Sequence, residues 1–332
     1  MTTKHKVIFD TDPGVDDAMA LYFALAHPDI DILGITTIFG NVTVQQATAN
    51  ALYLTRIAGY DIPVAGGAPV PLAKAAGMPP GFIHGDDGLG NLDQRSAIDA
   101  QPESCSAAEY IVSMARAHPG EITLVAVAPL ANLGLALKIE PNLPKLLKRV
   151  ILMAGTVTEP GNVSPVAEAN VWNDPDAADL VFTAGWNLTM VGLDVTHRVV
   201  LPSSFFVELA KKHNHLAMTT LSHAANFYCD FYKSIRPELG HACYGHDVLA
   251  FVCLVAPELF KTQEGRIRVV TDGIANGQTM MDKLNGKIFY PQPGWEPDKP
   301  VTHACMQVDV NACIQLIETT LAGNWLKAPL TV

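Results

Sequence analysis

The chain has 332 residues, of which 49% are hydrophobic and 17% charged, and its formal net charge is −11 at pH 7. This composition is typical of a globular protein with a large core. The negative charge argues against a nucleic-acid-binding surface, because such surfaces are basic and neutralise phosphates.

The opening residues and the cysteines predict a cytoplasmic protein. The first apolar stretch ends at Asp10, which is too short for a secretory signal, and no run of about 18 uncharged apolar residues predicts a membrane span. The six cysteines form no CxxC pair and lie mostly in apolar runs. We interpret them as reduced core thiols.

Short apolar runs alternate with helical patterns through the first 200 residues. This alternation predicts an α/β fold, with an open, mostly parallel sheet and helices on both faces. The expected strands are Lys6–Phe9, Asp31–Thr37, Ile122–Val127, Arg149–Met153 and Leu188–Gly192. The expected helices are Asp16–Ala26, Val44–Ala58, Ala107–Ala117, Leu130–Ile139 and Pro175–Ala184. Between them, Gly66–Asp93 is rich in Gly, Pro and Asp, and a loop of that length is often functional.

After residue 200 the pattern predicts extra helices and then a small antiparallel excursion of the sheet. The expected helices are Pro202–His213, Leu216–Tyr232, Asp247–Ala256 and a closing Asp309–Ala322. The expected late strands are Gly265–Val270, Ile274–Met281 and Thr302–Val308. Because there is no linker and no internal repeat, we expect a single domain over residues 1–332.

The most informative segment is an acidic turn that follows the first strand. Asp10, Asp12, Asp16 and Asp17 fall within eight residues, at the strand end where open α/β sheets bind ligands. An ordinary turn before a helix accounts for Asp16 and Asp17, which favour a helix N-terminus. It leaves Asp10 and Asp12 as a source of repulsion that a bound cation would remove. Oxygen ligands favour calcium or magnesium over zinc.

The stretch Asp10–Asp17 resembles the signature of the inosine-uridine preferring nucleoside hydrolase family. Further segments resemble that family in its own order across almost the whole chain, which makes the resemblance specific. They are Ile35–Asn41, Ile83–Gly88, Val127–Asn132, Ile151–Gly155, Gly161–Asn170 and Gly245–Asp247. The resemblance implies a Rossmann-like nucleoside hydrolase fold and the hydrolysis of ribonucleosides to free nucleobase and ribose.

The resemblance also implies a calcium ion. Asp12, Asp17 and Asp247 would bind it through carboxylate oxygens and Val127 through its backbone carbonyl. Ribose hydroxyls and a water would complete a shell of oxygens that suits calcium better than octahedral magnesium. Asp10 would support the site without contacting the metal itself. The alternative for Asp247 is a helix N-cap.

The same resemblance implies residues that hold the substrate. Side chains that would bind the ribose or pack on it are Asp16, Asn41, Met153, Asn162, Glu168 and Asn170. Each alternatively is an ordinary turn or core residue. His84 would line the nucleobase pocket or lie exposed in its loop. An aromatic cluster would form a wall over the nucleobase or belong to the core; it consists of Phe227, Tyr228, Phe231 and Tyr232.

Hydrolysis of an N-glycosidic bond passes through an oxocarbenium-like state. Asp12 would be the general base for an attacking water. In the resembled family a histidine at the position of His246 is the acid, so His246 would protonate the departing nucleobase. The resemblance also implies a homotetramer or homodimer. The alternatives are a haloacid-dehalogenase-like magnesium phosphotransferase, from the Asp10-Thr-Asp12 spacing, and a non-catalytic nucleoside-binding protein. A dinucleotide enzyme is not expected, because no GxGxxG motif opens a helix after a strand.

Overall fold

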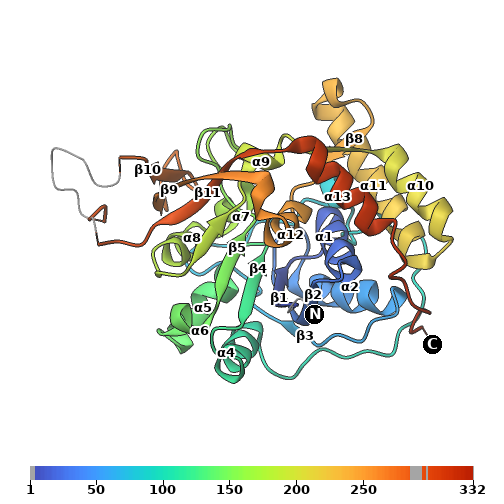
Figure 1. Cartoon of the computed structure of the whole chain (residues 1–332), viewed down its shortest axis with the longest axis horizontal. Helices are drawn as coiled ribbons and strands as arrows, with labels where there is room; N and C mark the ends of the chain where they lie inside the picture. Colours follow the sequence, from blue (N-terminus) through green and yellow to red (C-terminus); the bar gives the residue numbers. More distant parts are fainter. Residues whose placement is uncertain (1–3, 285–293, 297, 332) are drawn as a thin grey trace.

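The structure, a computed structural model, describes residues 4–284, 294–296 and 298–331 (Figure 1). The strands are β1 His5–Thr11, β2 Ile30–Thr37, β3 Val64–Gly66, β4 Ile122–Ala126, β5 Arg149–Leu152, β6 Leu188–Met190, β7 Val200–Pro202, β8 Ala242–Tyr244, β9 Phe260–Val269, β10 Thr279–Asp282 and β11 Thr302–Val308. Within the described residues they form a nine-stranded sheet, in the order β10-β9-β11-β6-β5-β4-β1-β2-β3, and a separate β7-β8 pair. The strands from β11 to β3 pair in parallel, whereas β9 and β10 are antiparallel. The predicted α/β fold and its late antiparallel excursion are confirmed.

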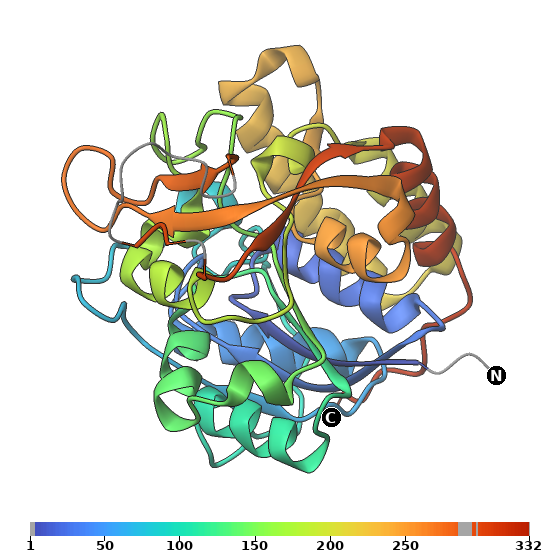
Figure 2. The same cartoon turned by 60° about the vertical axis from the view of Figure 1, so that its left-hand side comes forward.

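Helices cover both faces of the sheet (Figures 1 and 2). They are α1 Val15–Ala26, α2 Val44–Ile57, α3 Gly81–His84, α4 Ala107–Ala117, α5 Ala131–Ile139, α6 Leu143–Leu146, α7 Ala169–Asn173, α8 Pro175–Phe182, α9 Leu193–Thr196, α10 Ser203–His213, α11 Leu216–Ile235, α12 Val248–Val255 and α13 Val310–Leu321, with the 3-10 turns η1 Pro237–Leu239 and η2 Pro257–Leu259.

Alternate residues of the central strands face two separate cores. Phe9 and Ile151 pack with α1, α11, α12 and α13 on one face. Ile8 and Leu152 pack with α4, α5 and α8 on the other. Because successive side chains of a strand point to opposite faces, a sheet covered on both sides needs apolar residues at every position.

The structure corrects the predicted elements in a few places. The predicted strand Ile274–Met281 is wrong over its first half, because Gly273 and Gly277 adopt φ angles of 74° and 83° and the strand begins only at Thr279. The predicted loop Gly66–Asp93 contains the short helix α3. The other unpredicted elements have three to five residues, too few for a period to show; they are β3, β7, β8, α6, α7 and α9.

None of the helices in the described ranges is long and apolar enough to cross a membrane. All six cysteines are free. Five of them are buried and Cys105 is partly exposed. The interpretation of the cysteines as unpaired is therefore confirmed, and it describes core residues for all but Cys105.

Gly34 of β2 allows the closest approach between the sheet and α4. The hydroxyl of Tyr110 donates to the Leu33 carbonyl at 2.9 Å, and a Cβ at residue 34 would lie 2.5 Å from a ring carbon of Tyr110. We predict that Gly34→Ala lowers the free energy of unfolding by about 1–3 kcal/mol through overpacking. Urea denaturation checks this, with Gly77→Ala as control because nothing lies within 4 Å of a Cβ there. Equal midpoints for the two variants would contradict the prediction.

Candidate functional site

A cavity of about 690 Å³ lies at the carboxyl edge of the parallel strands. Its lining includes residues that come after three of these strands: Val127 directly follows β4, Met153 directly follows β5, and Asn41 lies in the loop after β2. The sequence-predicted residues that line it are Asp16, Asn41, His84, Val127, Met153, Asn162, Glu168, Asn170, Tyr228, Phe231, Tyr232, His246 and Asp247. The structure therefore brings together residues that are more than 200 positions apart in the chain.

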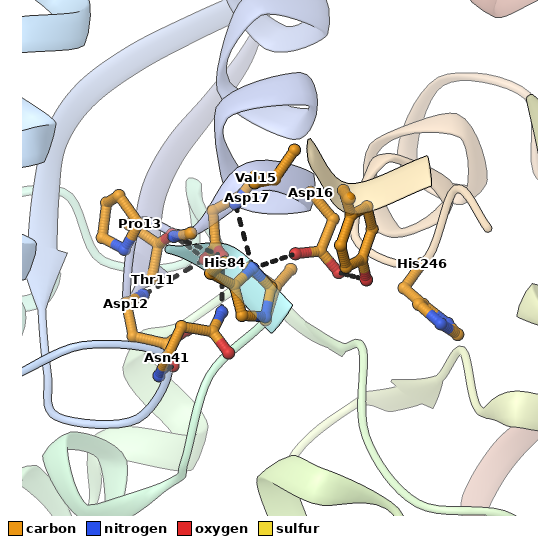
Figure 3. Close-up of polar contacts among 12 residues, drawn as sticks. Thr11, Asp12, Pro13, Val15, Asp16, Asp17, Asn41, His84 and His246 are labelled. Atoms are coloured by element: carbon orange, nitrogen blue, oxygen red, sulfur yellow. Dashed lines mark hydrogen bonds and ion pairs between the residues drawn. The ribbon is translucent and has the colours of Figure 1, made fainter. Parts of the chain in front are cut away.

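The turn between β1 and α1 is built around the carboxylate of Asp17. Its oxygens accept hydrogen bonds from the hydroxyl of Thr11, from the backbone N–H of Asp12 at 3.2 Å and from the N–H of Gly14 at 3.0 Å. The Asn41 side-chain amide donates to it at 2.9 Å. The helix N-terminus adds a favourable dipole. Asp17 thus fixes the start of α1 and the position of the neighbouring acids (Figure 3).

Three buried carboxylates each keep one oxygen without a hydrogen-bond partner in the described residues: Asp10, Asp12 and Asp16. Their other oxygens are held. Asp10 accepts from Thr36 and Asn132, Asp12 from the Asn41 backbone N–H at 2.6 Å, and Asp16 from the Tyr228 hydroxyl at 3.2 Å. A buried acceptor without a partner is costly. These free oxygens indicate that something else binds here.

The acids of the site raise one another's pKa. Burial, and then the charge of Asp17, raises the pKa of Asp12 well above its usual value and that of Asp16 to about 7. Burial, and then Asp16 and Asp17, raises the pKa of Asp247 well above its usual value. Burial alone raises the pKa of Asp10 to about 7. A divalent cation among these groups would favour their charged forms.

The carboxylates closest to a common centre are Asp16, Asp17 and Asp247, whose oxygens lie within 4.8 Å of one another. Asp17 and Asp247 were both predicted as ligands. Asp16 was predicted to bind ribose, whereas Asp12, predicted as a ligand, is not part of this cluster. Asp247 occupies the N-cap position of α12, but its side chain makes no capping hydrogen bond, so capping does not explain the carboxylate.

Glu168 and Asn170 organise the wall beside this cluster. Glu168 caps α7 by accepting from the backbone N–H groups of Asn170 at 2.8 Å and Val171 at 3.2 Å. It also accepts from the N–H of Gly155 at 2.8 Å, and burial raises its pKa to about 7. The amide of Asn170 donates to the carbonyls of Val127 at 2.9 Å and Met153 at 3.0 Å. The Val127 carbonyl keeps a second lone pair. Both side chains line the cavity, and their hydrogen bonds hold the backbone segments around it in place.

Asn162 is exposed at the rim of the cavity. Its carbonyl oxygen accepts from the N–H of Ala169 at 3.0 Å. Asn162 is therefore an ordinary turn residue, which was the alternative in the sequence analysis, and it also lines the cavity.

The opposite end of the cavity is aromatic. His84 is buried and stacks on Tyr228, with ring centroids 5.2 Å apart, so the alternative of an exposed loop histidine is wrong. Its Nδ1 accepts from the N–H of Val15 at 3.2 Å, and burial lowers its pKa to about 3. Gly14 leaves room for this ring, since a Cβ there would lie 2.6 Å from Nδ1.

His246 lies beyond Asp16, at the aromatic end (Figure 3). Its Nε2 is 3.0 Å from the Tyr232 hydroxyl and its Nδ1 is 2.8 Å from the Thr196 hydroxyl. Burial, and then the neighbouring His197 and His84, lowers its pKa well below the usual value. His246 is therefore a neutral ring with both nitrogens hydrogen-bonded.

Three of the four residues of the predicted aromatic wall line the cavity: Tyr228, Phe231 and Tyr232. Phe227 does not, and its assignment to the wall is wrong. It is half-buried beside Gly90, whose added Cβ would lie 2.9 Å from the Phe227 Cβ. One residue along a helix is a turn of about 100°, which carries Phe227 away from the cavity.

Comparison with known proteins identifies the family. The profile of the inosine-uridine preferring nucleoside hydrolases matches residues 7–315. This chain belongs to that family. It is 38% identical to uridine nucleosidase 1 of Arabidopsis thaliana over 323 residues, which cover 96% of the chain and 94% of the relative. A plant nucleoside hydrolase structure superposes with a TM-score of 0.90 at 36% identity, covering 96% of this chain and 99% of that one. A purine-preferring ribonucleoside hydrolase from Gardnerella vaginalis gives 0.87 at 31%, covering 96% and 98%.

Membership of the nucleoside hydrolases confirms the predicted kind of enzyme, one that cleaves the N-glycosidic bond of nucleosides. It favours this reading over the haloacid-dehalogenase-like phosphotransferase. The roles of individual residues stay predictions.

Sequence reasoning missed several residues at the aromatic end of this nucleoside hydrolase site. His197 and Tyr244 line the cavity with ring centroids 4.8 Å apart, and His197 lies 5.6 Å from His246. Arg236 also lines the cavity, at the end of α11. One signal was available for His197: it lies in the segment between β6 and β7, directly after the short helix α9, and other site residues also lie in segments that follow strands.

Proposed function

We propose that this protein is a calcium-dependent hydrolase that converts ribonucleosides to free nucleobase and ribose. The observation that carries the proposal is the set of buried carboxylates at one end of a cavity whose other end is aromatic. One end suits a cation and a polyhydroxylated sugar, and the other suits a flat, apolar ring. We further propose, from the family resemblance, that the protein works in the cytoplasm as a homotetramer or homodimer.

The donors at the acidic end fit a hard cation. All are oxygens, and several are buried without a partner. Asp17 and Asp247 would hold the ion together with the carboxylate of Asp12 and the carbonyl of Val127. A set with this many oxygens favours calcium over magnesium. When bound, calcium would position the ribose hydroxyls and make a neighbouring water more acidic.

The ribose would lie against the polar wall of the cavity. The side chains that would bind its hydroxyls are Asp16, Asn41, Asn162, Glu168 and Asn170. The partnerless oxygen of Asp16 can accept from a hydroxyl, and short amide groups both donate and accept. Met153 would pack on the sugar ring.

Asp12 is the proposed general base. Its Oδ2 is fixed by the Asn41 N–H, and its Oδ1 is free to accept a proton from a water. Attack by this water on the anomeric carbon, opposite the departing nucleobase, gives inversion.

His246 is the proposed group that assists the departing nucleobase. Negative charge grows on the nucleobase as the bond breaks, and a hydrogen bond donated by the ring would stabilise it. Because the pKa of His246 is lowered, this donor is the N–H of a neutral imidazole. Tyr228, Phe231 and Tyr232 would pack against the nucleobase.

Removal of metal tests the cation. Treatment with a chelator should abolish the release of reducing sugar from inosine and uridine, because the buried carboxylates would then repel one another and leave the ribose unplaced. Calcium should restore the activity better than magnesium or zinc. Full activity in thoroughly metal-stripped protein would contradict the calcium proposal, and no activity on any ribonucleoside with calcium present would favour the non-catalytic alternative.

Substitution of Asp12 tests the base. Asp12→Asn should lower kcat on inosine or uridine by at least about 10²–10⁴, the usual contribution of a general base, because it removes both the proton acceptor and a carboxylate charge. Asp61→Asn, at an exposed carboxylate in the loop after α2 that pairs with Arg56, is the control and should leave kcat unchanged. Near wild-type turnover in Asp12→Asn would show that another group takes the proton.

Substitution of His246 tests assistance to the leaving group. His246→Ala should lower kcat on inosine far more than kcat on para-nitrophenyl riboside, whose phenolate departs without help. Calcium affinity should be retained, because the proposed ligand is Asp247. An equal loss on both substrates, or a loss of calcium binding, would assign His246 to the structure of the site instead.

A further inference from the structure

The two nitrogens of the His246 ring face different surroundings. The partner of Nε2 is the hydroxyl of Tyr232, which lines the cavity. The partner of Nδ1 is the hydroxyl of Thr196, which is fully buried and behind the cavity wall. Nε2 is therefore the nitrogen that can reach a bound nucleobase. Whether it carries the proton depends on which way the surrounding hydrogen bonds run.

A chain of hydrogen bonds from Asp16 sets that direction. In its ionised form, which a cation bound in the acidic cluster would favour, Asp16 only accepts, so the hydroxyl of Tyr228 donates to it at 3.2 Å. With its proton used there, Tyr228 accepts from the hydroxyl of Tyr232 at 3.3 Å. Tyr232 in turn accepts from Nε2 of His246 at 3.0 Å. The proton of the neutral ring is then on Nε2, and Nδ1 is an acceptor.

The partner for this acceptor comes from α9. We propose that Thr196 is a positioning residue for the leaving-group step: its hydroxyl donates to Nδ1 of His246 and so holds the ring with its proton on Nε2, toward the nucleobase. The inference rests on the proposed role of His246. Without the hydroxyl, Nδ1 would be a buried acceptor with no partner, and the ring would gain by turning over or moving.

The structure around Thr196 is rigid. Gly192 begins α9 and brings the chain against Gly155, where a Cβ at residue 192 would lie 2.7 Å from the Gly155 carbonyl oxygen. The buried carboxylate of Asp194 accepts from the backbone N–H groups of Val157 and Thr158, each at 2.7 Å. A four-residue helix is thus fastened to the loop after β5, and it carries the Thr196 hydroxyl at a fixed place.

Thr196→Val tests the proposal, because it keeps the shape of the side chain and removes the hydroxyl. With calcium present, the variant should lower kcat on inosine or uridine by about 10- to 100-fold, the scale of a misplaced catalytic group, with little change in KM. Turnover of para-nitrophenyl riboside should stay near wild type. Thr196→Ser should restore nucleoside turnover. Thr55→Val, which removes another buried hydroxyl, in α2, should change neither substrate.

A double variant separates positioning from general damage. In the His246→Ala background, Thr196→Val should cost nothing further, because residues that act through one group are not additive. Wild-type nucleoside turnover in Thr196→Val, an equal loss on both substrates, or an additive loss in the double variant would overturn the proposal. If Thr196→Val does not fold, Thr196→Ala is measured by the same criteria. Lack of nucleoside hydrolysis by the wild-type protein would instead refute the proposed function.

Discussion

The burial of several carboxylates side by side at the cavity is the constraint on which the site depends. Burial raises the pKa of Asp12, Asp16, Asp17 and Asp247, and the charges of neighbouring acids raise those of Asp12, Asp16 and Asp247 further. The fold tolerates them because the start of α1 supplies backbone N–H donors and Asn41 supplies two more. These donors satisfy only part of the acceptors. The oxygens left over are the groups that we propose bind a cation and the hydroxyl groups of the substrate.

The same constraint reaches the other end of the cavity. Asp16 belongs to the acidic cluster and also ends the chain of hydroxyls that runs through Tyr228 and Tyr232 to His246. In the proposed reaction, the orientation of His246 would follow from a carboxylate that also binds the sugar. Sugar binding and nucleobase departure would then be linked through this chain of hydrogen bonds.

The sequence predicted the acidic end well and the aromatic end less well. Asp17 and Asp247 could be paired because the Asp10–Asp17 turn and Gly245–Asp247 both matched the family in order. The sequence did not predict that Asp16, and not Asp12, belongs to the carboxylate cluster. That depends on the directions of side chains at the start of a helix, which a sequence pattern does not contain. Phe227 was placed in the wall because four aromatic residues lie close together in sequence. Which of them line the cavity is decided by the face of α11 on which each residue lies.

Thr196 and His197 were missed for a different reason. The helix α9 has four residues, so it shows no period, and the importance of Thr196 comes only from a hydrogen bond to a residue 50 positions away. Short polar segments after strands are the places where such partners gather in an open parallel sheet. Their presence can be expected from sequence, but their pairing needs the fold.

The two ends of the cavity differ in how firmly the fold holds them. The acidic end rests on the ends of β1, β2, β4 and β5, which are parallel strands of one sheet. The aromatic end is carried by α3 and α11, where Phe82 is 72% and Ile235 is 54% exposed although both line the cavity. Relatives described as a uridine nucleosidase and as a purine-preferring ribonucleoside hydrolase match almost the whole of this chain. Because the proposed ribose end is built on the sheet edge, a preference between nucleobases would arise at the proposed nucleobase end, from the residues on α3 and α11 together with His197 and Tyr244.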